Sequence, residues 1–211
     1  MNIETLVVGP FQCNCRILSD PKSNEAIIID PGDEPEAILE YVNRQGLKIK
    51  ALLHTHGHLD HVLATAGVKA ATQAPVYLHK GDLPLYENLR KQCELFGLDA
   101  GEGPVPVDHF LEHEMDITLG TKKLKTIFTP GHSPGSCCFY VEGKAPMVFS
   151  GDTLFLKSIG RTDLWGGNSD QIAKSIKQRL YTLDGDTLVL AGHGPDSSIA
   201  YEKRNNPFVS S

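Results

Sequence analysis

The chain has 211 residues, of which 40% are hydrophobic and 22% charged, with a formal net charge of -6 at pH 7. A chain of this length buries an ample core, so we expect one compact catalytic domain over residues 1–211. The acidic balance argues against a nucleic-acid partner, and no run approaches the roughly 20 apolar residues of a membrane span.

Targeting and redox features point to the cytoplasm. The N-terminus lacks a basic region followed by a long apolar one, so we expect no signal peptide. The five cysteines are an odd number, which fits a reducing compartment better than a disulfide framework. Their apolar neighbourhoods are typical of small core residues. A cytoplasmic location is the expectation, and the oligomeric state stays open.

The first half of the chain predicts strands that alternate with helices. The run from Ala26 to Asp30 is almost entirely apolar, as in a strand buried on both faces. Asp33 is the predicted N-cap of a helix that ends near Gly46. The expected elements are strands at 3–8, 13–18 and 26–30, a helix at 34–45, a strand at 47–53, and helices at 59–72 and 81–96.

The second half, from about Val105, is rich in strands. Its clearest helix is 169–180, with Asn168 or Ser169 as the cap and an apolar stripe along one face. Strands are expected at 115–119, 124–128, 137–141, 147–149 and 187–190. This order predicts an α/β protein with two β-sheets faced by helices.

The segment 55–61, with the sequence THGHLDH, holds three imidazoles and one carboxylate directly after a predicted strand. Neutral imidazole and carboxylate are the usual ligands of zinc and related ions. His56 and His58 are two apart, so in an extended loop both project to one side and can share an ion. If a helix begins near Leu59, Asp60 and His61 point towards a second ion.

Three later apolar runs also end in glycine and then present one ligand-type residue. They place His132 in TPGHSPG (129–135), Asp152 in FSGDT (149–153) and His193 in LAGHGP (190–195). A single histidine beside glycine is more often an ordinary loop residue. Three such strand ends after the THGHLDH segment indicate a metal centre built on loops.

Together these residues resemble the metallo-β-lactamase superfamily over nearly the whole chain. The resemblance implies an αββα sandwich whose ligand loops meet at one edge. It also implies two metal sites, the first of His56, His58 and His132 and the second of Asp60, His61 and His193, bridged by Asp152. The chain is most similar to short-form glyoxalase II (hydroxyacylglutathione hydrolase-like), through DTLF (152–155), GRTDL (160–164), GGN (166–168) and GHGP (192–195).

This resemblance implies an enzyme, a dinuclear metal-dependent hydrolase of acyl-thioesters, with S-D-lactoylglutathione as the expected substrate. Hydroxide held between two divalent ions about 3.5 to 4 Å apart would attack the thioester carbonyl and release D-lactate and glutathione. Asp60 would ligate the second ion and hold the nucleophile in line. Zinc is the expected metal, although iron and manganese suit the same ligands.

The region expected to bind substrate departs from full-length glyoxalase II. The C-terminal helical extension that supplies basic residues for glutathione is missing, which leaves the true thioester open. Arg161 is the candidate partner of a substrate carboxylate, and an ion pair with Asp163 is the alternative. Asp30 fits either a group behind the metals or a turn residue, and Trp165 fits either the cleft or a packing contact.

Two functions of other classes stay open. Persulfide dioxygenases share the ligand set and GRTD (160–163) but use one iron. A non-enzymatic module that binds a metal or a partner would also fit the fold. The DTLF and GGN segments favour the hydrolase over the dioxygenase, and the complete ligand set argues against the binding module.

Overall fold

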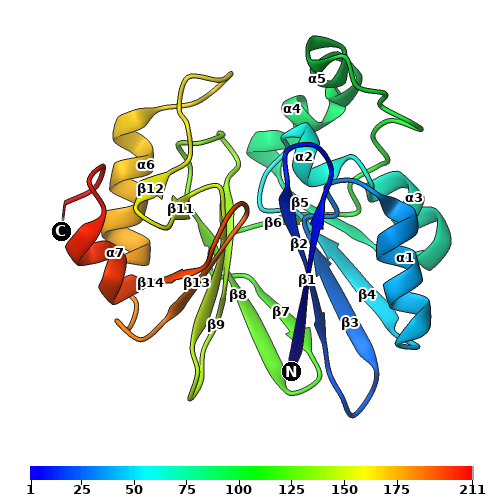
Figure 1. Cartoon of the computed structure of the whole chain (residues 1–211), viewed down its shortest axis with the longest axis horizontal. Helices are drawn as coiled ribbons and strands as arrows, with labels where there is room; N and C mark the ends of the chain where they lie inside the picture. Colours follow the sequence, from blue (N-terminus) through cyan, green and yellow to red (C-terminus); the bar gives the residue numbers. More distant parts are fainter. Residues whose placement is uncertain (211) are drawn as a thin grey trace.

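Two six-stranded β-sheets face one another in the computed structural model, which describes residues 1–210 (Figure 1). The first sheet consists, in spatial order, of β1 (Asn2–Val8), β2 (Cys13–Ser19), β3 (Glu25–Ile29), β4 (Lys48–Leu53), β5 (Val76–His79) and β6 (His109–Leu111). The second consists of β14 (Ser197–Ser198), β13 (Leu188–Ala191), β10 (Met147–Gly151), β9 (Cys137–Val141), β8 (Lys122–Phe128) and β7 (Asp116–Leu119). A small hairpin joins β11 (Leu154–Phe155) and β12 (Ser158–Ile159).

The central strands of the first sheet are covered on both faces. Ile27 and Ile29 of β3 belong to the core between the sheets, whereas Ile28 of the same strand belongs to the core beneath the outer helices. Successive strand residues point to opposite faces, so a run that is apolar throughout marks a strand buried on both sides. Phe139 and Phe149 bring large side chains from the second sheet into the same inter-sheet core.

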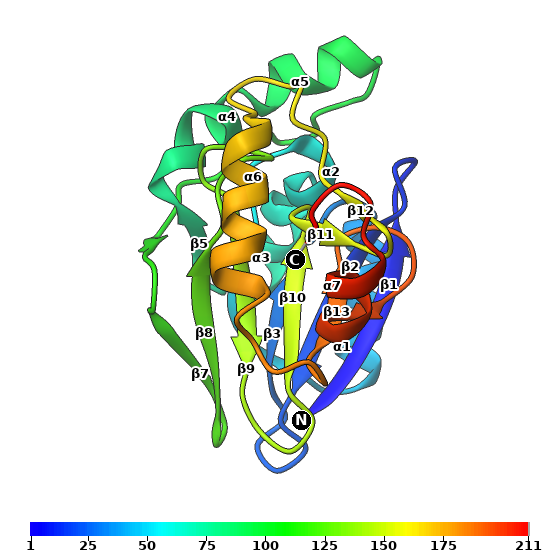
Figure 2. The same ribbon diagram turned by 90° about the vertical axis from the view of Figure 1, so that its left-hand side faces the viewer.

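Helices cover the outer faces of both sheets and complete four layers. α1 (Pro35–Arg44) and α3 (Thr65–Thr72) pack apolar side chains against the first sheet. α6 (Ser169–Ser175) and the π-helical turn that continues it (η2, Ile176–Leu180) lie along the second sheet, with α7 (Ile199–Asn205) on the same side (Figure 2). The αββα sandwich predicted from the sequence is confirmed.

Short helical segments lie beyond the strand ends, at the edge where the predicted ligand loops emerge (Figure 1). They are α2 (Leu59–Val62), η1 (Lys80–Asp82), α4 (Leu83–Glu87) and α5 (Leu89–Phe96). One apolar cluster, which includes Leu59, Leu78 and Leu89, holds them against the end of the first sheet. Among residues 1–210, no helix has both the length and the hydropathy of a membrane span.

Two helices predicted as continuous are interrupted, so both single-helix predictions are wrong. The helix at 59–72 divides into α2 and α3, because the N–H of Ala64 donates to Pro31 O at 3.1 Å rather than within the helix. The helix at 81–96 divides at Asn88, whose side chain donates back to Pro84 O at 2.7 Å. Short pieces can wrap around the ligand loops, which one long helix could not.

The predicted N-cap at Asp33 is also wrong. Glu34 precedes α1 in the left-handed region, with φ +54°, and its carbonyl accepts the first helical hydrogen bonds. Asp33 instead accepts the N–H of Glu34 through Oδ1 at 2.7 Å. The other predicted strands and helices agree with the structure within two residues at each end, except that the helix at 169–180 is α-helical only to Ser175 and ends as the π-helical turn η2. Of its two predicted caps, Asn168 is the one that caps α6.

Some elements have no counterpart among the predictions. β5 and β6 are only four and three residues long, too short for an alternating pattern to be recognised. The two-residue strands β11, β12 and β14, and the helix α7, are likewise absent from the expected order of elements.

Candidate metal centre

The predicted ligands converge at one edge of the sandwich. β3 and β4 run parallel, as do β10 and β13, so within each sheet the carboxyl ends of these strands share an edge. Ligands follow β4, β8, β10 and β13, and two more begin α2. In chain order these residues are His56, His58, Asp60, His61, His132, Asp152 and His193.

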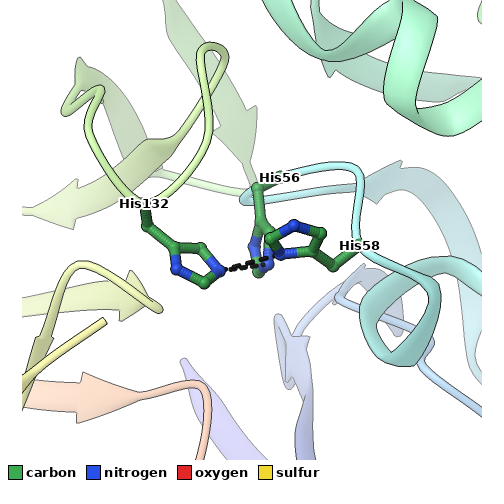
Figure 3. A group of neighbouring side chains, drawn as sticks. All are labelled: His56, His58 and His132. Atoms are coloured by element: carbon green, nitrogen blue, oxygen red, sulfur yellow. Dashed lines mark hydrogen bonds between the residues drawn. The ribbon is translucent and has the colours of Figure 1, made fainter. Parts of the chain in front are cut away.

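The first group consists of His56, His58 and His132, whose rings face one another (Figure 3). His132 Nε2 lies 2.8 Å from His58 Nδ1 and 3.2 Å from His56 Nε2. Burial lowers the pKa of His58 to about 3, and it lowers the pKa of His56 well below its usual value. Both imidazoles are therefore neutral at physiological pH, which is the form that ligates a metal.

The second group consists of Asp60, His61 and His193. His193 Nε2 lies 3.1 Å from His61 Nε2 and 3.2 Å from Asp60 Oδ2. Asp152 lies between the two groups, with Oδ1 3.4 Å from His61 Nε2 and Oδ2 3.6 Å from His132 Nε2. Its carboxylate thus presents one oxygen to each group, the arrangement that a bridging ligand requires.

The donors fit divalent cations. Asp152 Oδ1 is buried and has no hydrogen-bond partner, which is costly for a carboxylate oxygen unless a cation contacts it. Burial opposes a charge on His61, but the carboxylates of Asp152, Asp60 and Asp30 help to raise its pKa well above the usual value. The second group therefore attracts positive charge. Imidazole and carboxylate donors suit zinc, iron and manganese.

Groups behind the ligands fix their orientation. Asp30 accepts hydrogen bonds from Thr55 N and Oγ1, both at 2.7 Å, and its Oδ2 lies 3.0 Å from His61 Nδ1. The ring nitrogens of His132 and His193 that face away from the cluster contact backbone carbonyls at 2.8 Å and 3.2 Å. Such contacts select the tautomer and hold the ring in place. Asp30 therefore matches its interpretation as a group behind the metal ligands rather than as a turn residue.

Sequence reasoning missed Asp82, which joins the two loops of the first group. This buried carboxylate accepts hydrogen bonds from Gly57 N at 2.8 Å, Ser133 Oγ at 2.7 Å and Gly135 N at 2.5 Å. Gly57 separates His56 from His58, and Ser133 follows the third histidine. A usable signal existed, because in VYLHKGD (76–82) a short apolar run is followed, two residues later, by glycine and one carboxylate.

A cavity of about 260 Å³ opens beside both groups, and His58, Asp60, His132 and Asp152 all contribute to its lining. Arg161 and Trp165 line it as well. Arg161 forms a bidentate ion pair with Asp163, both contacts at 2.7 Å, as the alternative interpretation expected. A role for Arg161 in substrate binding stays a prediction.

All five cysteines are buried and none forms a disulfide, which matches their interpretation as small core residues. Cys13 lies nearest the site, with Sγ 3.6 Å from His61 Nδ1. Burial raises the pKa of Cys13 to about 11, so its sulfur stays a thiol. None of these side chains is placed as a nucleophile.

Known proteins are similar in sequence to nearly the whole chain. The family model described as the metallo-beta-lactamase superfamily matches residues 8–193. A probable metallo-hydrolase, YqgX of Bacillus subtilis, is 40% identical over 99% of this chain and 98% of its own. Hydroxyacylglutathione hydrolase GloC of Haemophilus influenzae is 37% identical over 100% of this chain and 99% of its own.

Solved structures are also similar to this chain. BLEG-1 B3 metallo-beta-lactamase has a TM-score of 0.90 at 37% identity, and each chain is covered to 100%. TTHA1623 in a di-iron-bound form has a TM-score of 0.89 at 41% identity, over 98% of this chain and 100% of its own. ETHE1 from Myxococcus xanthus has a TM-score of 0.81 at 27% identity, over 98% of this chain and 84% of its own.

Proposed function

Because the chain belongs to the metallo-beta-lactamase superfamily, we propose that it is an enzyme, a metal-dependent hydrolase of acyl-thioesters. S-D-lactoylglutathione is the substrate to test first, since the GloC relative is named a hydroxyacylglutathione hydrolase. The observation that carries the proposal is the position of Asp152, which presents one oxygen to each group of histidines and leaves buried Oδ1 unpartnered.

In this reaction the metals would activate the water and the carbonyl group, and side chains of the protein would orient the water. Two divalent ions bound here would supply a water molecule that ionises near neutral pH and a Lewis acid for the carbonyl oxygen. Burial disfavours the charge on Asp60, but His61 and His193 hold the pKa of this carboxyl well below its usual range. Asp60 is therefore ionised, and from the cavity wall it can accept a hydrogen bond from water and orient it.

Release of the thiol product requires no proton donor from the chain. A thiolate leaves a tetrahedral intermediate without first taking up a proton, because thiols are far more acidic than alcohols. None of the side chains that line the cavity is therefore required as a general acid. We expect no acyl-cysteine intermediate, since all five cysteines are buried thiols.

Chelation and reconstitution test this proposal. We expect the protein as isolated to release free thiol from S-D-lactoylglutathione, to lose this activity after dialysis against a chelator, and to regain it with zinc. Elemental analysis of the same samples checks that the chelator removed the metal. Thiol release at an unchanged rate by metal-free protein would contradict the proposal.

Persulfide dioxygenase activity is the second candidate, and the similarity to ETHE1 favours it. This reaction requires molecular oxygen and a redox-active iron with open coordination positions. The di-iron form of TTHA1623 makes iron the alternative to zinc. An oxygen electrode separates the candidates: we expect the iron-loaded protein to consume no oxygen with glutathione persulfide, and persulfide-dependent uptake without thioester cleavage would favour the dioxygenase.

A further inference from the structure

The cavity beside the predicted ligands has an apolar wall built from three separate segments. The β1–β2 loop, the helices α4 and α5, and the loop before α6 all contribute to it. Its members are Phe11, Leu85, Leu95, Phe96, Leu164 and Trp165. The rings of Phe11 and Phe96 meet edge to face with centroids 5.3 Å apart, which joins two of the segments. The apolar wall is therefore a surface assembled by the fold rather than one face of a helix.

Much of the apolar wall is exposed to solvent. Leu95 is 79% exposed, Trp165 59% and Phe96 52%. A single exposed apolar side chain is ordinary, but an exposed cluster beside a site marks a surface that binds something. This cluster borders the same cavity as His58, Asp60, His132 and Asp152, so a substrate at the metal centre would cover it.

The polar side chains of the cavity, apart from the predicted ligands, are already paired. Gln92 donates to the carbonyls of Gly57 and Leu85 and accepts a backbone N–H. Arg161 is held by both oxygens of Asp163. Arg161 is the one lysine or arginine among the described residues that line the cavity, and a substrate carboxylate would have to displace Asp163 from it. A bound group would meet mainly apolar atoms.

We propose that the apolar wall binds an extended apolar group, an alkyl chain or an aromatic ring, that flanks the thioester carbonyl of the substrate. This inference rests on the proposed thioester hydrolysis and narrows its substrate class. A lactoyl group offers the wall one methyl. For the carboxylates of glutathione the cavity itself presents, among the described residues, only Arg161, which is paired with Asp163, and Lys91 lies in the adjoining hollow. Each added methylene should strengthen binding about fourfold while it is buried.

Binding can be measured without catalysis, because Trp165 is the only tryptophan of the chain and belongs to the apolar wall. The probes are thioethers of N-acetylcysteamine with ethyl, butyl, hexyl and octyl chains, which cannot be hydrolysed. Titrated into the zinc-loaded protein, they should change the fluorescence of Trp165, with a Kd that falls two- to fourfold per methylene. A Kd independent of chain length would overturn the inference.

Two variants and one control locate the binding surface. Leu95→Ser and Phe96→Ser change exposed side chains, so folding is retained, and each should reduce the dependence of Kd on chain length. Phe208→Ser changes an equally exposed aromatic residue that does not line the cavity, and the full dependence should remain. An unchanged dependence in both wall variants would show that the chains bind elsewhere.

Hydrolysis identifies which side of the thioester lies on the wall. One series extends the acyl group from acetyl to octanoyl on N-acetylcysteamine, and the other extends the thiol of an acetyl thioester. We expect kcat/KM to rise with length in one series. Cleavage at equal rates throughout both would overturn the apolar-group inference and leave thioester hydrolysis standing. Thioether binding with no cleavage of any thioester would support the binding of apolar groups at the wall and overturn the proposed thioester hydrolysis.

A second copy of the chain is the competing occupant of this surface. Sedimentation at several protein concentrations distinguishes it from a substrate. We expect Leu95→Ser to leave the sedimentation coefficient unchanged. A dimer that dissociates in this variant would overturn the inference, because the wall would then be covered by another protomer.

Discussion

Asp152 connects the two groups of predicted ligands, so its substitution tests whether they form one centre. Asparagine keeps one oxygen but loses the charge, and we expect Asp152→Asn to lower the occupancy of both sites together. Elemental analysis of protein never exposed to chelator measures this. Asp163→Asn, at an exposed carboxylate paired with Arg161, should keep the metal content of the parent protein. Loss of a single ion in Asp152→Asn would show that the carboxylate does not bridge.

Asp82 makes a second prediction at the residue scale. The amide of Asp82→Asn can accept fewer hydrogen bonds from the two loops that carry His56, His58 and His132. We expect zinc to bind the first site about 10- to 100-fold more weakly, as calorimetric titration of metal-free protein would show. Asp116→Asn, in an exposed pair with Lys123, is the matched control. Equal zinc affinities in the two variants would show that Asp82 does not support the first site.

His54 makes stability depend on pH. Burial lowers its pKa from the usual 6.5 to about 4, so between these values the unfolded chain binds a proton that the folded chain does not. Stability from this group is therefore complete above pH 6.5 and is lost as pH falls towards 4. The loss amounts to about 2 kcal/mol between pH 7 and pH 5.

Urea unfolding at the two pH values checks this prediction. His54→Gln keeps a side chain that can hydrogen-bond Thr65, whose Oγ1 lies 2.7 Å from His54 Nε2. The variant should lose about 2 kcal/mol of the pH dependence of the free energy of unfolding. A variant with the same pH dependence as the parent protein would mean that His54 is not the group responsible.

At the scale of elements, α6 is tied to the ligand loop through its cap. Asn168 Oδ1 accepts the N–H of Gln171 at 2.9 Å, and the N–H of Asn168 donates to Gly131 O at 2.7 Å, next to His132. We expect Asn168→Ala to lower the free energy of unfolding by about 1 kcal/mol. Gln171→Ala, at an exposed position in the same turn, should change it by less than about 0.5 kcal/mol. Equal losses in the two variants would argue against the cap.

The elements also show where sequence reasoning reaches its limit. The apolar strand that contains Ile27 to Ile29 is predictable because its pattern is set locally by burial on both faces. The division of the helix at 59–72 is not, because it depends on a hydrogen bond between Ala64 and Pro31, which are distant in sequence. Helix boundaries near the site follow from tertiary contacts that no local pattern contains.

At the scale of the whole molecule, ligand positions were more predictable than the surface that receives the substrate. The ligands lie at predicted strand ends beside glycine, and the resemblance to metallo-β-lactamases assigns them to two sites, so His56, His132 and Asp152 could be grouped before any coordinates. The apolar wall depends on how α5 and two loops approach one another. Phe11 and Phe96 lie far apart in the sequence, and nothing near either residue predicts their contact.

The most direct measurement tests whether an oxygen atom of water enters the product. The protein loaded with zinc, which has no redox chemistry, is given S-D-lactoylglutathione under argon in ¹⁸O-labelled water. Hydrolysis predicts one free thiol for each lactate formed and one labelled oxygen in the lactate carboxylate. No thiol release from this thioester or from the acyl series on N-acetylcysteamine, although elemental analysis finds both sites filled, would contradict the account.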